Sequence, residues 1–168
     1  MIKVKRYFLE LDLKKYKEVS FALPKGISIN IETKKNPALN KFFYKQIGSD
    51  HHWKDRLAWS ERDWKTYISN KNLHTGVIRH DDDLIGYYEV EFHMMTKEVE
   101  LINMGVLKEF RGKKLGSLLL NHVIKFASAK DARRLWVHTC SLDHKNALLN
   151  YKSKGFEVFK EEEVNYVA

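Results

Sequence analysis

The stretch that decides the fold is FRGKKLGSLLLNHVIKF, residues 110–126. It begins with two glycines among three cationic side chains, and apolar residues then recur at helical spacing. Amide groups at a helix start have no partner within the helix, the helix dipole favours negative charge there, and glycine lets an anion approach the main chain. The stretch therefore predicts a basic loop that opens a helix of about four turns and holds either a phosphate group or nothing.

Two common phosphate-binding loops do not fit these residues. The stretch lacks the pattern Gly-x-x-x-x-Gly-Lys-Ser/Thr, and it lacks the three-glycine dinucleotide fingerprint with its following acidic residue. A different loop has to explain the arrangement.

The sequence around the loop predicts a run of strands and helices. Upstream, residues 75–80, 84–92 and 98–107 predict three strands of an antiparallel meander. Downstream, residues 133–140 predict a strand, a helix from Asp143 through Lys154 ends at Gly155, and a further strand follows at 156–159. The second half thus reads strand, helix, strand, helix, strand.

The first part of the chain predicts strands followed by two helices. Residues 2–11 have short-period alternation, and residues 19–23 and 27–32 flank a Pro-Lys-Gly turn, which predicts a hairpin. Asn36 followed by Pro37 predicts the start of a helix that Gly48 ends, and Ser60 begins a Ser-x-x-acid capping pattern for a helix over about 61–69. We therefore expect one α/β domain over residues 1–168, without repeats or a linker.

The composition limits the class of protein but does not identify its binding partner. The net charge of +8 favours anionic partners: nucleic acid, an acidic membrane face or a cofactor that carries phosphates. Cys140 is the only cysteine, and the opening residues MIKVKRYFLELDLKK interleave charged with apolar side chains. We therefore expect no disulfide, signal peptide or membrane span, and a cytoplasmic location.

Two motifs resemble one family. Residues 111–116, Arg-Gly-Lys-Lys-Leu-Gly, resemble the Arg/Gln-x-x-Gly-x-Gly/Ala signature of the GCN5-related N-acetyltransferases, with Lys114 in place of the middle glycine. Ala147-x-x-x-Tyr151-x-x-x-Gly155-Phe156 is similar to the downstream family pattern Asn-x-x-Ala-x-x-x-Tyr-x-x-x-Gly-Phe, with His144 at the asparagine position. The aromatic segment 53–64 also resembles members of this family.

The resemblance implies a mixed, mostly antiparallel sheet flanked by helices, with acetyl-CoA as co-substrate. In that family the loop grips the pyrophosphate, and the strand before it pairs with the pantetheine arm. The expected cofactor-binding residues are therefore Met104, Gly105, Val106, Arg111, Gly112, Lys113, Lys114, Leu115, Gly116, His144, Ala147 and Tyr151.

The resemblance also implies catalytic roles. Tyr151 stands where the family has its general acid, and a phenol keeps its proton at neutral pH; its alternative role is packing of the helix on the sheet. Glu100 is the expected base, because residues 100, 102, 104 and 106 share strand parity and Glu100 would face the side of the pantetheine arm. A solvated strand glutamate is its alternative, and Glu89 and Glu91 compete with it.

The acceptor side is less specific. Trp53, Arg56, Trp59 and Glu89 are the candidate substrate-binding residues, with core packing as the alternative for the tryptophans. Arg56 has the chemistry to pair with a substrate carboxylate. His138, Cys140 and His144 have a spacing compatible with zinc, but only one thiolate is available, and we expect no metal.

The leading function is transfer of an acetyl group from acetyl-CoA directly to a primary amine of a small molecule, peptide or protein. The alternative is a catalytically weak CoA-binding sensor or interaction module of the same fold, which Lys114 and His144 favour. Nucleic acid is disfavoured as a partner because acidic residues interleave with the cations. A homodimer is left open.

Overall fold

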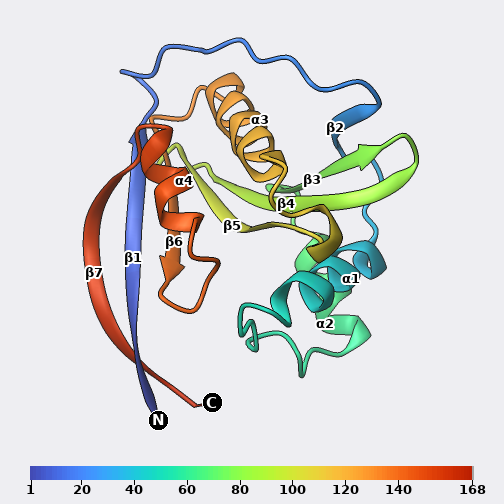
Figure 1. Cartoon of the computed structure of the whole chain (residues 1–168), viewed down its shortest axis with the longest axis vertical. Helices are drawn as coiled ribbons and strands as arrows, with labels where there is room; N and C mark the ends of the chain where they lie inside the picture. The colour runs from blue at the N-terminus through green and yellow to red at the C-terminus, as the bar shows by residue number, and fades with distance from the viewer. Residues whose placement is uncertain (168) are drawn as a thin grey trace.

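The fold is built on one mixed sheet of seven strands. The computed structural model describes residues 1–167, and its strands lie in the order β2-β3-β4-β5-β6-β1-β7 (Figure 1). Every neighbouring pair is antiparallel except β5 and β6, which are parallel. The strands are β1 (Ile2–Asp12), β2 (Ile27–Ile31), β3 (Leu73–His80), β4 (Asp83–His93), β5 (Glu98–Val106), β6 (Arg134–Cys140) and β7 (Glu157–Tyr166).

Four helices flank the sheet in two groups. The helices are α1 (Pro37–Gly48), α2 (Glu61–Ile68), α3 (Leu115–Ala129) and α4 (Ala147–Ser153), with a short 3-10 turn at Lys108–Phe110. Figure 1 shows α1 and α2 side by side, away from α3 and α4. The apolar residues of α3 pack with β4, β5 and β6 in the main core, whereas Phe43 and Ile47 of α1 pack with Tyr87 in a second cluster.

The helix starts follow from local hydrogen bonding. The Asn36 side chain accepts a hydrogen bond from the Leu39 amide, and Pro37 occupies the first turn of α1. Ser60 and Asp63 form a complete capping box at the start of α2. These starts, the meander β3–β5 and the long helix α3 confirm the sequence predictions for those segments.

The sheet opens between its two parallel strands. β5 and β6 are joined through α3, and they pair only from Glu98 with Arg134 to Leu101 with Val137. Beyond these residues the strands diverge, so the remainder of β5 has no partner on that side. A gap in the sheet therefore arises from strand geometry.

A β-bulge lies at the point of divergence. Glu89 pairs with Asn103 and Val90 pairs with Leu101, so Ile102 is an extra residue in β5. Val99 and Leu101 share the α3 side with Met104 and Val106, whereas a Cβ on Gly105 would meet Ile47 of α1. The parity argument for Glu100 is therefore wrong, because the bulge reverses the alternation and puts Glu100 on the face opposite Met104 and Val106.

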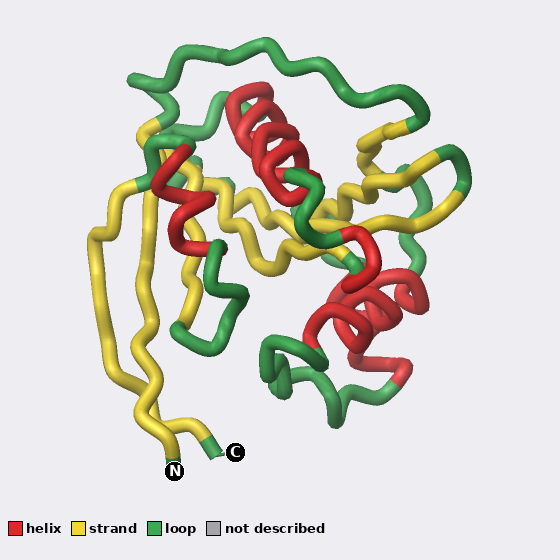
Figure 2. The backbone as a smooth tube through the Cα atoms, in the orientation of Figure 1, coloured by secondary structure: helices red, strands yellow, loops and turns green. Residues whose placement is uncertain are grey.

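Two further sequence predictions fail for identifiable reasons. Residues 19–23 form no strand but belong to a long loop that crosses the molecule from β1 to β2 (Figure 2), and Val19 is 65% exposed. The expected hairpin is absent there because β2 pairs with the distant β3. Asp143 does not cap a helix; α4 begins at Ala147, because the Asp143 carboxylate accepts hydrogen bonds from the end of β6 instead.

Within residues 1–167, the helices are too short or too polar for a transmembrane segment.

Candidate active site

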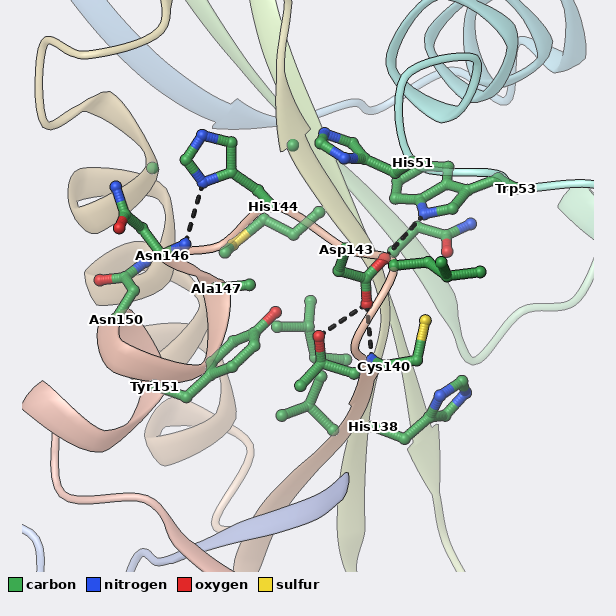
Figure 3. Close-up of a pocket in the computed structure, with 18 of the residues that line it drawn as sticks. His51, Trp53, His138, Cys140, Asp143, His144, Asn146, Ala147, Asn150 and Tyr151 are labelled. Carbon is green, nitrogen blue, oxygen red and sulfur yellow. Dashed lines mark hydrogen bonds between the residues drawn. The ribbon is translucent and has the colours of Figure 1, made fainter. Parts of the chain in front are cut away.

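A cavity of about 940 Å³ occupies the opening between β5 and β6. One end is lined by the loop that leads into α3, and the other by the connection between α1 and α2. α4 and the segment before it form a further wall. Figure 3 shows side chains from the α1–α2 connection, the end of β6 and the α4 wall around the same space.

The loop before α3 forms an open basic cradle. Gly112 has φ of +80° and Lys114 has φ of +61°, both in the left-handed region, and this turn sets the start of α3. No side chain caps this helix end. A Cβ placed on Gly112 or Gly116 would meet nothing within 4 Å, so the main chain there is accessible. The arrangement supplies free amide groups and positive charge, which together suit an anion.

The structure brings most of the expected cofactor-binding residues to this cavity. Lys113 is the exception, since its ammonium group lies 5.8 Å from the centre of the Phe110 ring and the residue does not line the cavity. The expected residues that do line it are Met104, Gly105, Val106, Arg111, Gly112, Lys114, Leu115, Gly116, His144, Ala147 and Tyr151.

Arg111 connects the cradle to neighbouring segments. Its Nε donates to the Val106 carbonyl at 3.2 Å, and one terminal nitrogen donates to Asp50 at 3.0 Å. The other terminal nitrogen is buried and has no hydrogen-bond partner within residues 1–167. The side chain is therefore held in place with one donor still available.

Tyr151 is buried in the α4 wall of the cavity. Its ring packs against Phe156 at 5.6 Å between centroids, and Figure 3 shows the hydroxyl pointing away from α4 toward the middle of the pocket. Burial, with a smaller contribution from the Asp143 charge, raises the pKa of this phenol well above its ordinary value. Tyr151 therefore carries its proton at neutral pH.

Asp143 links two walls of the cavity. Its carboxylate accepts hydrogen bonds from Thr139 Oγ1 at 2.6 Å and from the Cys140 amide at 2.9 Å, both at the end of β6. It also accepts from Trp53 Nε1 at 3.3 Å, which belongs to the α1–α2 connection (Figure 3). His144 lies next to it, with its ring 6.0 Å from that of His51.

Arg56 and Glu89 form a buried polar cluster beside the cavity. Glu89 is fully buried, and its carboxylate accepts a hydrogen bond from the Arg56 guanidinium at 2.9 Å. It also accepts hydrogen bonds from the side chains of Asn40, Tyr67 and Asn103. The guanidinium group of Arg56 also lies over four aromatic rings at 4.3–5.6 Å. Arg56 is therefore committed to Glu89, which differs from the expected pairing with a substrate carboxylate.

The four expected substrate-binding residues are divided by the fold. Trp53 and Arg56 line the cavity, whereas Glu89 and Trp59 do not. Trp59 packs edge-on against Trp64 and Tyr67, which is the packing role that the sequence left open.

Glu100 is not brought to the cavity. Its carboxylate lies 3.0 Å from His93 Nε2 and the residue does not line the pocket. The bulge at Ile102 accounts for this position. Glu91, its competitor on β4, lies 3.4 Å from the same His93 ring and is also outside the cavity.

His138 and Cys140 face the cavity from the opposite side of β6 to Tyr151 (Figure 3). Burial, and then the charge of Arg6, lower the pKa of the His138 imidazole, although Glu100, Asp143 and Asp55 act in the other direction. Burial raises the pKa of the Cys140 thiol. Both groups are therefore predominantly uncharged at neutral pH.

Sequence reasoning missed several residues of the cavity. His51 and Asn103 line it, and Asp143 connects its walls, but no local pattern singled out these functions. The spacing of His138 suggests only a zinc ligand, and its shared parity with Cys140 is the one sequence signal that both side chains lie on a common face. Among the described residues, no group of three or more His, Cys, Asp or Glu side chains is arranged to hold a metal ion.

Comparison with known proteins identifies the family. The profile of the Acetyltransferase (GNAT) family matches residues 36–156, and the chain belongs to this family. The resemblance seen in the two motifs is thereby confirmed, as is the fold class that it implied.

Among characterised relatives, the chain is similar to streptothricin acetyltransferase of Streptomyces lavendulae, with 26% identity over 125 residues. The match covers 74% of this chain and 60% of the relative, so the chain spans less than two thirds of that protein.

Solved structures share the fold at low sequence identity. A GCN5-related N-acetyltransferase from Sphaerobacter thermophilus matches with a TM-score of 0.70 and 14% identity, over 94% of this chain and 49% of that one. An aminoglycoside acetyltransferase from an uncultured soil metagenomic sample, in complex with trehalose, matches with a TM-score of 0.65 and 13% identity, over 85% of this chain and 95% of that one.

Proposed function

We propose that this protein is an acetyl-CoA-dependent N-acetyltransferase that transfers the acetyl group directly to a primary amine. One observation carries the proposal: a single cavity joins the basic cradle before α3, the buried hydroxyl of Tyr151 and the α1–α2 connection. Membership of the GNAT family supports an acyltransferase.

The residues of the cavity fit a CoA thioester. The accessible main chain at Gly112 and Gly116, the positive charge of Lys114 and the unpartnered nitrogen of Arg111 suit a diphosphate. Beyond Leu101 the β6-facing edge of β5 is free to pair with an extended chain such as the pantetheine arm. Acetyl-CoA supplies an activated acetyl group in the form of a thioester.

The protein contributes hydrogen bonds and a proton to the reaction. Amide groups from residues 104–106 of β5 would polarise the thioester carbonyl, and such donors need no reorganisation during the reaction. Tyr151 would donate its proton to the departing sulfur. Without a proton the sulfur would leave as a charged thiolate, which is unfavourable in a site shielded from water, although a thiol has an ordinary pKa of only about 8.5. The raised pKa of Tyr151 keeps this acid loaded before each turnover.

The relatives guide the choice of acceptors. A streptothricin acetyltransferase is similar in sequence, and the aminoglycoside acetyltransferase that shares the fold has also been solved in complex with sisomicin. Streptothricin and sisomicin therefore belong in the first panel of amines. Spermidine and a lysine-containing peptide extend the panel to other primary amines. Release of free CoA thiol from acetyl-CoA measures transfer to each.

The Tyr151→Phe variant tests the acid. We expect kcat to fall by about 100-fold or more, with CoA affinity and folding retained, because only a proton donor is removed. Tyr16→Phe is the matched control, since Tyr16 packs against the core away from the cavity. Unchanged turnover in Tyr151→Phe would leave this residue with a packing role alone.

A CoA-binding module without useful catalysis is the second candidate. The Lys114 side chain favours it, because this residue stands at the cradle where a glycine would leave the backbone bare. Calorimetry with CoA and the thiol assay separate the two functions. Tight CoA binding without thiol release across the whole panel would favour the module.

A further inference from the structure

We propose that His138 is the catalytic base that takes a proton from the ammonium group of the acceptor. The inference rests on the proposed acetyl transfer and assigns a role that Glu100 does not fill in this fold. The cavity, the hydrogen-bond pattern around it and the charges facing the imidazole carry it together.

The position of His138 places it where an acceptor amine would arrive. It directly follows Val137, the last residue of β6 that pairs with β5, so it stands at the edge of the opening in the sheet. Val137 and Thr139 are buried, and His138 projects to the other face together with Cys140 (Figure 3). Its ring lies against Phe8 of β1, with 5.7 Å between centroids, which limits where it can turn.

His138 has a nitrogen available for a new hydrogen bond. Within residues 1–167 its imidazole makes no hydrogen bond, although it lines the cavity. Three other basic groups near the cavity are occupied: Asp143 accepts three hydrogen bonds, His144 Nδ1 accepts from the Asn146 amide at 3.1 Å, and Glu100 lies against His93. The Asp55 carboxylate also lines the cavity, but it is exposed to solvent, and its charge acts on the His138 ring.

His51 is the competing imidazole in the cavity. The charges that lower its pKa after burial are those of Arg111 and His144, so it lies toward the cradle, where a proton is opposed by positive neighbours. His51 belongs to the α1–α2 connection, with its ring 6.4 Å from that of Trp53, but no carboxylate of that connection beyond Asp50 acts on it. The charges of Glu100 and Asp55 act on His138 and favour its protonated form. The structure therefore favours His138 over His51 for accepting a proton.

The charges around His138 suit a group that gains and then loses a proton. The charges of three carboxylates from three segments act on it: Glu100 on β5, Asp143 after β6 and Asp55 in the α1–α2 connection. Arg6 on β1 opposes them, but it is paired with Glu162 at 3.1 Å. His138 is exposed as a whole residue, but desolvation of its ring still lowers the imidazole pKa, which keeps it neutral before the reaction. The carboxylates stabilise the imidazolium once it forms.

The proton balance of the reaction has a place for both His138 and Tyr151. The acceptor ammonium gives one proton to His138, and the nitrogen lone pair then forms a bond to the thioester carbonyl carbon. The carbon–sulfur bond breaks with its electron pair going to sulfur, which takes the Tyr151 proton. The second proton leaving the new amide nitrogen restores Tyr151, and His138 returns its proton to water.

The first test is a pH profile of kcat/KM for the wild type, His138→Gln and the control His80→Gln, using the best acceptor of the amine panel. His80 is exposed on β3 and does not line the cavity. We expect His138→Gln to lose about 100-fold or more at pH 7 and to recover toward the amine pKa of about 10, where the free amine exists without help. The KM for acetyl-CoA should stay unchanged.

A loss that is equal at all pH values, or an unchanged profile, would overturn the assignment. The assignment would also be overturned if His51→Gln, and not His138→Gln, removed the fall of kcat/KM at low pH. No thiol release by the wild type with any amine would instead overturn the proposed function, and with it the role of His138. If the wild type is active and the His138→Gln profile is unaltered, only the role of His138 as catalytic base is contradicted.

A second measurement does not depend on catalysis or on the folding of a variant. NMR titration of the His138 imidazole in the wild-type protein, assigned from the backbone resonances of neighbouring residues, reports its protonation directly. We expect the ring to titrate below the ordinary histidine value of about 6.5. A ring that is already protonated at pH 7 would contradict its role as a base.

Discussion

At the scale of single residues, Lys114 shows how the cradle is made. The residue before α3 must adopt a left-handed backbone, and here a lysine does so with φ of +61°. A side chain in that conformation costs roughly 1–2 kcal/mol, which glycine avoids. Lys114 contributes positive charge to the cradle, but its backbone conformation is unfavourable for the folded state.

The Lys114→Gly variant separates these two contributions. We expect its free energy of unfolding to exceed that of Lys114→Ala by about 1 kcal/mol, because both variants lose the charge and only glycine relieves the backbone. Urea unfolding measures the difference, and calorimetry with CoA compares both with the wild type. Equal stability of the two variants would show that the left-handed turn carries no such cost.

Glu89 carries a different prediction at this scale. Glu89→Gln removes the charge opposite Arg56, which is 10% exposed, and leaves a buried cation without its partner. We expect the free energy of unfolding to fall by about 3 kcal/mol or more. Glu91→Gln on the same strand is the matched control, because that side chain is 26% exposed and should change stability far less. Similar losses in both would argue against an important buried pair.

The sequence predicts single residues well where a motif fixes their spacing. The two motifs predict Tyr151 and the cradle residues, and all of these except Lys113 line one cavity. Whether Tyr151 acts as the acid stays a prediction. The sequence predicts Arg56 at the cavity but not its pairing with Glu89, and it misplaces Glu89 and Glu100. Their partners come from segments far away in the chain, and no local pattern encodes which polar groups meet inside.

At the scale of elements, close packing of β5 against α1 shapes the cavity wall. Gly105 lies in the β5 segment that lines the cavity, and a Cβ there would come within 2.5 Å of Ile47 Cγ2. A larger residue would therefore push α1 away from the sheet or move the wall of the active site.

The Gly105→Ala variant tests this packing. We expect a loss of about 1–3 kcal/mol in the free energy of unfolding, which is typical of overpacking. Combining it with Ile47→Ala removes the clashing methyl group, so the two losses should not add. Purely additive losses in this double-mutant cycle would mean that the helix and strand adjust independently.

Element prediction succeeds for strongly patterned segments and fails where tertiary pairing decides. The capped helices and the meander have local signals, and they occur where expected. Residues 19–23 have strand-like side chains but find no partner, because β2 is taken by β3. The bulge at Ile102 inserts one residue, and no glycine or proline at that position indicates it in the sequence. This one residue puts Glu100, the expected base, on the other face of the sheet.

At the scale of the whole molecule, four histidines couple the fold to pH. Burial lowers the pKa of His51, His74, His122 and His138 below the ordinary value of 6.5. The unfolded chain therefore takes up protons first as the pH falls. Their contribution to stability is fully present above pH of about 6.5 and is lost below it.

We therefore expect the urea midpoint of unfolding to fall between pH 7.5 and 5.5. The Tyr88 hydroxyl lies 2.7 Å from His122 Nδ1, so His122→Gln keeps a polar partner and removes one titrating ring. This variant should show a smaller slope of stability against pH than the wild type does. A flat or rising wild-type midpoint on acidification would contradict the direction of these shifts.

The order of strands in the sheet lies beyond what local patterns specify. β1 is inserted between β6 and β7, its partners at the opposite end of the chain, so both chain ends lie together (Figure 1). Resemblance to a family supplied the general architecture, whereas periodicity supplied only the pieces. Long-range pairing depends on which apolar faces fit together after the chain has collapsed, and no short window of sequence contains that information.

The parting of β5 from β6 has an evolutionary consequence. Since backbone geometry creates the space, substitutions in the α1–α2 connection can reshape one end of the cavity while the cradle before α3 stays intact. Under the proposed function, acceptor selectivity and CoA binding would depend on separate stretches of chain, so that substitutions could change the first without loss of the second.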